Sequence, residues 1–201
     1  VHAFGGHIIA QIIHFGPQGR SGALDDYREL WGPSTMKSPA YNEWGREMTR
    51  EQMREVSEHF AQTALNSKAA GFDGVELHYS HGYLHQQFLS FVYNKRTDEY
   101  GGTLDNIVRF PIETMQAVRD AVGPDFVVGI RISMDECTVG GMKADTAIEM
   151  TCKLVETGLI DYVSATAGTY AAHADQIPPG DYAEDWLVED GARLRKAVQA
   201  I

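Results

Sequence analysis

The sequence predicts an α/β fold, a partial (β/α)8 TIM barrel, and three observations lead to it. Four short apolar runs alternate with helix-period segments along the chain, which is typical of right-handed βαβ units in a parallel sheet. A doubly wound dinucleotide-binding sheet would carry a G-x-G-x-x-G turn after a strand, and the sequence contains none. Polar residues instead follow the ends of successive apolar runs, where barrel enzymes keep their chemistry.

Each of the four apolar runs has the length of a strand. The first is nearly continuous isoleucine, which favours a strand covered on both faces of a sheet. Four strands make half of an eight-stranded barrel, so the chain is expected to form part of one. The runs are residues 7–13, 74–78, 126–132 and 161–165.

The segments between these runs have the spacing of helices. Residues 49–52 have the form of a capping box, and the apolar pattern that follows ends at Gly71. In the next pattern, over 103–122, Pro111 indicates either a kink or the start of the regular helix. Further helices are predicted over 146–156 and 184–201, and residues 1–4 read as the last turn of a helix.

The segment 16–48 is rich in glycine, proline and serine and is predicted to be one long loop. Loops of this length in a compact domain are usually functional.

Composition excludes several classes of protein. The 201 residues are 43% apolar and carry a formal charge of −11, which supports a folded core and disfavours binding to nucleic acid or anionic lipid. Only two cysteines are present, Cys137 and Cys152, too few for a disulfide framework. We therefore expect a cytoplasmic protein with a small-molecule substrate and no membrane partner; self-association stays open. Because the chain begins at Val1, residues 1–201 are expected to be the central part of a single barrel domain, truncated at both ends.

Gln11 is the first candidate site residue, because its amide lies among four isoleucines and is expected to be buried. One interpretation is a structural bond to a neighbouring strand or a water. The other is a bond to the edge of a heterocycle, for which the pyrimidine ring of a flavin is suitable.

Arg131 is the second candidate, because a guanidinium within a strand is costly to bury without an anion. The partner is either a carboxylate of the barrel, for instance Glu76, or an anionic ligand at the end of the strand.

His78, His81 and Tyr83 follow one another at the end of the second run. Two imidazoles in one turn can bind the same oxygen, and a nearby phenol can deliver a proton. A metal site that includes His85 is the alternative, although no carboxylate or cysteine lies nearby at the spacing of a ligand.

Several long strings stand out in the sequence: residues 71–84 (GFDGVELHYSHGYL), 87–90, 94–102 (NKRTDEYGG) and 109–110, with 11–14 and 128–133. These strings closely resemble the Old Yellow Enzyme family of FMN-dependent oxidoreductases. The resemblance covers most of the chain and is strongest toward the branch of 2,4-dienoyl-CoA reductases and trimethylamine dehydrogenase.

The resemblance implies that this chain is roughly strands 3 to 6 of an FMN-binding (β/α)8 barrel, with their helices. Gln11 then matches the glutamine at the flavin pyrimidine edge, and Arg131 the arginine beside N1 and C2=O. His78 and His81 match the pair that binds a substrate oxygen, and Tyr83 matches the proton donor. NAD(P)H is the implied electron donor, and any iron–sulfur cluster would lie outside this chain.

The sequence departs from the family pattern in two places. Residues 15–18 separate the first strand from Gly19-Arg20, which leaves the role of Arg20 open. Phe91 stands after Ser90 where the family commonly has proline.

The expected activity is hydride transfer from NAD(P)H through FMN to an activated C=C bond of an α,β-unsaturated carbonyl or enoyl substrate. The first alternative is an FMN-dependent amine dehydrogenase or N-demethylase, with Trp44, Tyr79, Asp175 and Asp181 as contributors to a cation site. The second is a catalytically silent binding module. The isolated chain is expected to be inactive.

Overall fold

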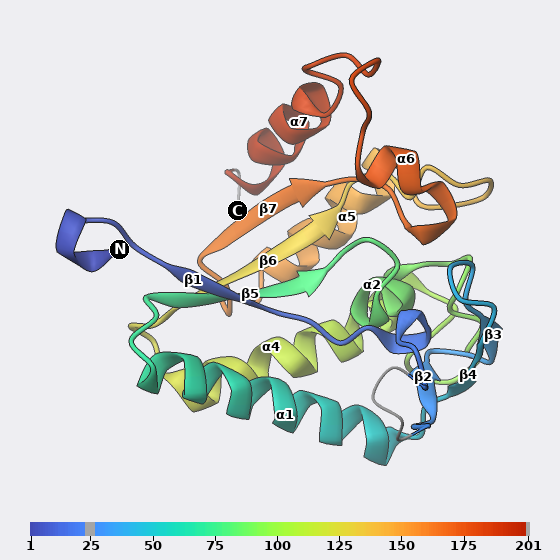
Figure 1. Ribbon diagram of the computed structural model, residues 1–201, viewed down its shortest axis with the longest axis horizontal. Coiled ribbons are helices and arrows are strands. Elements are labelled where there is room, and N and C mark those ends of the chain that lie inside the picture. The colour runs from blue at the N-terminus through green and yellow to red at the C-terminus, as the bar shows by residue number, and fades with distance from the viewer. Residues whose placement is uncertain (23–26, 200–201) are drawn as a thin grey trace.

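The computed structural model describes residues 1–22 and 27–199, in which a parallel sheet carries helices on one face (Figure 1). The sheet has four strands in the order β1-β5-β6-β7. They are β1 (Ile9–Ile12), β5 (Gly74–Tyr79), β6 (Val127–Ser133) and β7 (Tyr162–Thr166). All neighbouring pairs are parallel, so the predicted strands and their parallel arrangement are confirmed.

Helix α1 (Arg50–Ala69) begins where the sequence predicts it. The Thr49 hydroxyl accepts a hydrogen bond from the Gln52 N–H, and the Gln52 side chain accepts one from the Thr49 N–H, which completes the capping box. Figure 1 shows α1 and α4 (Arg109–Val122) side by side beneath the sheet. A buried hydrogen bond of 2.9 Å between the Ser57 and Thr114 hydroxyls joins the two helices.

The helix predicted over 103–122 is divided at Val108 into α3 (Leu104–Ile107) and α4. Pro111 is the third residue of α4, where its missing N–H removes no helical hydrogen bond. The regular helix therefore starts at the proline turn rather than kinking there.

The remaining predicted helices are α5 (Ala144–Val155) and α7 (Val188–Val198); residues 200 and 201 of the last prediction lie outside the described part of the chain. At the other end, residues 2–4 form a 3-10 helix closed by Gly5 at φ 71°. None of the helices in the described ranges is both long and apolar enough to cross a bilayer.

The core lies between the sheet and these helices. Strand residues alternate in direction, and on β5 the fully buried side chains are Val75, Leu77 and Tyr79. The equivalent positions of β6 pack beside them, and α1, α4 and α5 cover both strands. Core residues from these elements include Val128, Ile130, Ile132, Met53, Phe60, Phe110, Met115 and Met150.

Strand β1 differs from its prediction. It lies at the edge of the sheet with β5 as its one neighbour, and Ile8 and Ile9 are exposed rather than covered on both faces. A run of isoleucines indicates a buried strand, but which neighbours cover it depends on long-range packing.

The segment 16–48 is not a structureless loop. Its described residues include a short 3-10 helix (Gly16–Gln18) and a second sheet of order β2-β4-β3, made of β2 (Leu30–Gly32), β3 (Met36–Lys37) and β4 (Trp44–Glu47). Residues 23–26 lie outside the described part.

Arg96 fastens this second sheet to the rest of the molecule. Its guanidinium is buried and donates to the carbonyl oxygens of Pro33 and Met48, at 3.2 and 2.9 Å. A bidentate pair with Asp98, at 2.9 and 2.6 Å, holds the guanidinium in place. The string 94–102 thus has a structural function here.

The carboxyl ends of β5, β6 and β7 point toward one end of the molecule (Figure 1). Around that end lie three short helical elements that the sequence analysis missed: α2 (Leu84–Leu89), η3 (Tyr170–Ala172) and α6 (His173–Gln176).

Candidate functional site

Chemistry-bearing side chains occupy the sheet face opposite the helices, in two rows. Gln11, Glu76, Gly129 and Tyr162 are partners in the register of the four strands. The next row toward the carboxyl ends holds His78, Arg131 and Ser164. Such rows correspond to the inward-facing layers of a barrel.

In the first row, Glu76 binds a partner on each side. The Gln11 side-chain amide donates to Glu76 Oε1 at 2.6 Å, and the Tyr162 hydroxyl donates to Glu76 Oε2 at 3.1 Å. Of the two interpretations of Gln11, the bond to a neighbouring strand is therefore present. The expected burial is wrong: Gln11 is exposed, because β1 is an edge strand and no described element covers this face of it.

In the second row, Arg131 donates to the Ser164 hydroxyl at 3.1 Å and is half-buried. Within the described ranges Arg131 forms no ion pair with a carboxylate. Of its two possible partners, the carboxylate of Glu76 is therefore wrong. Glu76 is already bound by Gln11 and Tyr162. An uncompensated guanidinium suits an anionic or strongly accepting ligand, so Arg131 and the exposed Gln11 amide fit a flavin pyrimidine ring.

His78, His81 and Tyr83 come together where β5 ends. The ring centroids of His78 and His81 are 5.1 Å apart, and those of His78 and Tyr83 are 5.2 Å apart. His78 and Tyr83 are 4% and 9% exposed. The sequence prediction that these three side chains converge is consistent with this geometry, and their catalytic roles stay predictions.

The position of His81 depends on an unusual backbone. Its φ of 61° lies in the left-handed region, and its N–H donates to the Ser133 hydroxyl at 3.1 Å. On the side chain, Nε2 lies 3.0 Å from the Thr166 hydroxyl at the end of β7. Neighbouring strand ends thus fix both the backbone and the ring of His81.

Both imidazoles are uncharged at neutral pH. Burial, followed by the neighbouring His81 and Arg131, lowers the pKa of His78 to about 3. Burial and Arg131 lower the pKa of His81 to about 4. Two neutral rings can each donate one N–H to a ligand oxygen without carrying a positive charge.

Glutamines hold the turn that connects His81 to Tyr83. The Gly82 carbonyl accepts hydrogen bonds from the side chains of Gln87, at 2.7 Å, and Gln18, at 3.4 Å, and the Gly82 N–H donates to Gln86. Gln86 in turn donates to Glu136 Oε1 at 2.7 Å. All three glutamine side chains are buried, so these hydrogen bonds hold the turn in one conformation.

Sequence reasoning missed Gln18, Gln86 and Glu136. Two features of the sequence could have indicated them. Gln86 is one of two adjacent amides in a mostly apolar segment, and Glu136 follows the end of a strand, where the other candidate residues also lie. Burial raises the pKa of the Glu136 carboxyl, which also accepts the Met142 N–H at 2.8 Å.

Tyr170 is a further residue of the site that the sequence did not indicate. Its hydroxyl lies 3.0 Å from the Tyr83 hydroxyl, and the two rings meet edge to face at 5.4 Å.

The structure separates His85 from the histidine pair. His85 is fully buried in the core, stacked between the rings of Tyr79 and Phe110, and its Nε2 lies 3.1 Å from the Thr114 hydroxyl. The metal alternative therefore lacks its third ligand, and the described ranges hold no group of three or more histidine, cysteine or acidic side chains suited to a metal.

The expected contributors to a cation site are not together either. Tyr79 points into the core, where its hydroxyl donates to the Pro111 carbonyl at 3.0 Å, because it occupies the helix-facing position of β5. Asp175 accepts a hydrogen bond from Tyr182, and Trp44 lies exposed on β4 of the second sheet.

A cavity of about 540 Å³ adjoins the site. Tyr170 and Phe15 are part of its wall, together with Trp31, Tyr41 and Arg20. The Arg20 guanidinium lies over the Tyr41 ring, 5.4 Å from its centroid. The cavity thus has aromatic walls, and its charged lining residues are Arg20, Arg28 and Glu29.

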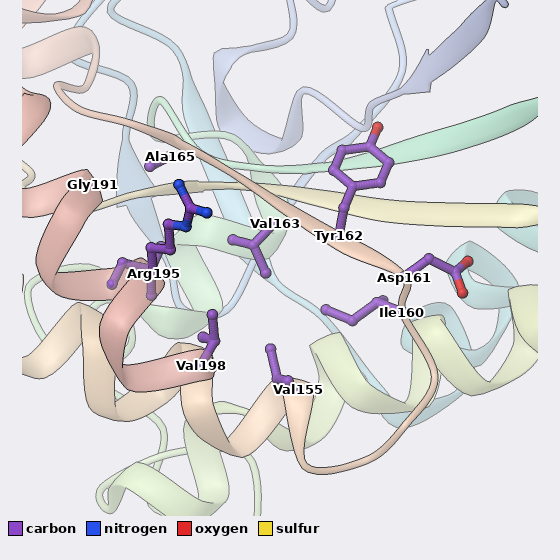
Figure 2. Close-up of a pocket in the computed structure, with 10 residues that line it drawn as sticks. Val155, Ile160, Asp161, Tyr162, Val163, Ala165, Gly191, Arg195 and Val198 are labelled. Atoms are coloured by element: carbon purple, nitrogen blue, oxygen red, sulfur yellow. The ribbon is translucent and has the colours of Figure 1, made fainter. Parts of the chain in front are cut away.

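Figure 2 shows a second cavity, of about 390 Å³, between β7 and α7. Val155, Ile160, Val163 and Val198 turn toward it, whereas the Tyr162 hydroxyl points away. Its aliphatic lining lies on the helix side of the sheet, so it is separate from the histidine cluster.

The chain is similar to known proteins in sequence and in fold. NADH oxidase of Thermoanaerobacter brockii is 32% identical over 98% of this chain, and the multifunctional alkene reductase/demethylase OYE of Caballeronia cordobensis is 34% identical over 98%. The chain spans about 30% of the length of these relatives.

A solved complex of 2-naphthoyl-CoA reductase with 2-naphthoyl-CoA is 32% identical, with a TM-score of 0.83 over 98% of this chain and 31% of that one. The fold is thus that of part of an Old Yellow Enzyme-type barrel, and the predicted fold class and resemblance are confirmed. The family model of NADH:flavin oxidoreductase / NADH oxidase matches residues 1–194. The chain belongs to the NADH:flavin oxidoreductase / NADH oxidase family.

Proposed function

We propose that the protein is an FMN-dependent NAD(P)H oxidoreductase that reduces the activated C=C bond of an α,β-unsaturated carbonyl or enoyl substrate. One observation carries the proposal: two neutral imidazoles and a phenol, His78, His81 and Tyr83, meet at the carboxyl end of β5. This set can hold an oxygen that gains negative charge and can supply a proton beside it.

Gln11 and Arg131 would hold the cofactor. The Gln11 amide offers a donor and an acceptor to the edge of the pyrimidine ring, and Arg131 supplies a positive charge that no carboxylate of the described residues neutralises. When FMN is bound, it accepts a hydride from NAD(P)H and delivers it to the β-carbon of the alkene.

The histidines act on the substrate oxygen. His78 and His81 each donate an N–H to the carbonyl oxygen and stabilise the enolate that forms as the β-carbon is reduced. Because both rings are uncharged at neutral pH, they bind the oxygen without protonating it. The Thr166 hydroxyl and the Ser133 hydroxyl fix the orientation of His81.

Tyr83 completes the reaction by donating its phenolic proton to the α-carbon. Tyr83 is the residue at the N-terminal end of α2, and its ring meets the Phe15 ring edge to face, with 5.4 Å between the ring centroids. Its low exposure keeps water from competing for the proton. The relatives named as alkene reductase and 2-naphthoyl-CoA reductase support this choice of substrate class.

Oxidation of an N-methylated amine is the second candidate. Its support is the relative named as an alkene reductase and demethylase, together with the aromatic walls of the 540 Å³ cavity, which suit a cation. The histidine pair favours the first candidate, because two N–H donors suit an oxygen and repel an ammonium group.

Anaerobic single-turnover spectroscopy of the full-length protein tests both candidates. We expect the purified protein to carry FMN, to be bleached by NAD(P)H, and to regain its flavin absorbance on addition of 2-cyclohexenone. Bleaching of the oxidised protein by N,N-dimethylglycine, without recovery by the enone, would replace the first candidate by the second. Protein without flavin would favour a silent binding module.

A further inference from the structure

The hydroxyl groups of Tyr83 and Tyr170 form a hydrogen bond of 3.0 Å. Tyr83 precedes α2, whereas Tyr170 starts the 3-10 helix that follows β7. The bond therefore joins the loops that follow two non-adjacent strands of the sheet, and the proposed mechanism does not use it.

The direction of this bond follows from the chemistry of Tyr83. A phenol has one O–H, and in the proposed reaction Tyr83 directs it toward the α-carbon of the substrate. The bond between the two oxygens can then exist only if Tyr170 donates. Burial, then the bond to Tyr83, raises the pKa of Tyr170 to about 12, so Tyr170 keeps its proton at neutral pH.

We propose that Tyr170 is a positioning residue that holds the Tyr83 oxygen and returns a proton to it after each turnover. This inference rests on the proposed function. When the Tyr83 O–H bond breaks and its proton forms a C–H bond at the α-carbon, a phenolate remains on Tyr83. The Tyr170 O–H stabilises that phenolate and then transfers its proton to it, and water from the adjoining cavity restores the proton of Tyr170.

The surroundings of Tyr170 suit this path. Tyr83 is 9% exposed, whereas Tyr170 is half-buried and lines the 540 Å³ cavity. The other titratable groups that face Tyr170 are Tyr41, at a ring distance of 6.2 Å, and His173, stacked at 6.1 Å. Neither is a carboxylate that would take a proton in place of Tyr83.

The test uses the full-length, FMN-loaded protein and three variants. Tyr170→Phe removes the donor, and Tyr83→Phe removes its partner. Tyr182→Phe is the matched control, because it deletes a tyrosine hydroxyl from the same connection after β7, one that donates to Asp175 at 2.8 Å.

In single-turnover kinetics, we expect Tyr170→Phe to slow the enone half-reaction about tenfold, the effect of one hydrogen bond to a charged group. Flavin reduction by NAD(P)H should not change, and Tyr182→Phe should leave both half-reactions intact. A purely structural role of Tyr170 would slow both half-reactions rather than the enone half-reaction alone.

A second measurement does not depend on turnover. With tyrosine labelled by ¹³C at the ring carbon that bears the hydroxyl, the Tyr170 resonance should titrate at lower pH in Tyr83→Phe than in the parent, because the bond to Tyr83 raises the pKa of Tyr170. Equal titrations in the two proteins would overturn the hydrogen-bonded pair.

The outcomes separate the two proposals. Suppose that the parent protein reduces the enone and that Tyr170→Phe does so at the same rate. This result overturns the role of Tyr170 and leaves the proposed function standing. A parent protein that never reoxidises with an enone overturns both, and the labelled spectra then assign the pair to structure alone.

Discussion

The ring of Tyr162 on β7 lies across the backbone of Gly129 on β6, so that a Cβ at residue 129 would overlap the ring. The missing side chain lets the Tyr162 hydroxyl reach Glu76 on β5, at 3.1 Å. Gly129 therefore permits the polar row that runs from Tyr162 through Glu76 to Gln11.

Gly129→Ala should destabilise the protein by about 1 to 3 kcal/mol, the usual cost of overpacking. Gly191→Ala is the control: this residue lies in α7 and a Cβ there meets nothing within 4 Å, so it should stabilise by about 0.5 to 1 kcal/mol. Denaturant unfolding measures both. Equal stability of Gly129→Ala and the parent would mean that Tyr162 does not pack over residue 129.

Tyr83→Phe keeps the ring and deletes only the acid. We expect the enone half-reaction to slow by about 100-fold or more, as is usual when a general acid is removed. Reduction of the flavin by NAD(P)H should stay within about twofold of the parent, because it needs no proton from Tyr83. Stopped-flow absorbance resolves the two steps, and equal slowing of both would refute the assignment of Tyr83 as proton donor.

Arg131→Gln removes the positive charge beside the proposed flavin. The reduced flavin is anionic, so it loses more electrostatic stabilisation than the oxidised flavin does. The midpoint potential should therefore fall by about 30 mV or more, which is a tenfold change in the equilibrium constant of a two-electron couple. Arg195→Gln, an exposed arginine of α7, is the control. Spectroelectrochemistry compares the two, and an unaltered potential in Arg131→Gln would count against contact with the flavin.

His85 should make stability depend on pH. Burial lowers the pKa of His85 in the folded state well below 6.5. At pH values between this lowered pKa and 6.5, His85 is protonated in the unfolded state and neutral in the folded state. Stability is therefore lost as pH falls below about 6.5. In His85→Gln this contribution is absent, so the difference in melting temperature from the parent should shrink as the pH is lowered.

Phe60→Leu is the control for lost packing around His85. The ring centroids of Phe60 and His85 are 4.7 Å apart, and the Phe60 side chain does not titrate. Its deficit in melting temperature should be nearly constant with pH. A constant deficit for His85→Gln as well would show that His85 takes up a proton in the folded state.

The features that the sequence predicted correctly depend on local information. The capping box at Thr49 and the apolar runs of β5 and β6 are contained within a few residues. His78, His81 and Tyr83 converge because one strand end and one turn carry all three.

The features that it missed depend on distant partners. The strands of the second sheet are short and contain few buried residues, so no apolar period marks them, and Arg96 holds them from more than forty residues away. Tyr170 lies beside Tyr83 because the strand before it, β7, pairs with β6 in the middle of the sheet. Gln11 was expected to be buried because isoleucines surround it in sequence, whereas its exposure is set by the position of β1 at the edge of the sheet.

Arg96 donates to the main-chain oxygens of Pro33 and Met48, at the two ends of the segment that carries Tyr41, and pairs with the Glu47 carboxylate at 3.4 Å. Two of these three contacts do not depend on which side chains the segment carries. The wall that Tyr41 contributes to the cavity lies between these two anchor points, so a substitution there would change the cavity and leave both main-chain anchors in place. Under the proposed function, such a substitution would alter which substrates fit without any change at His78, His81 or Tyr83.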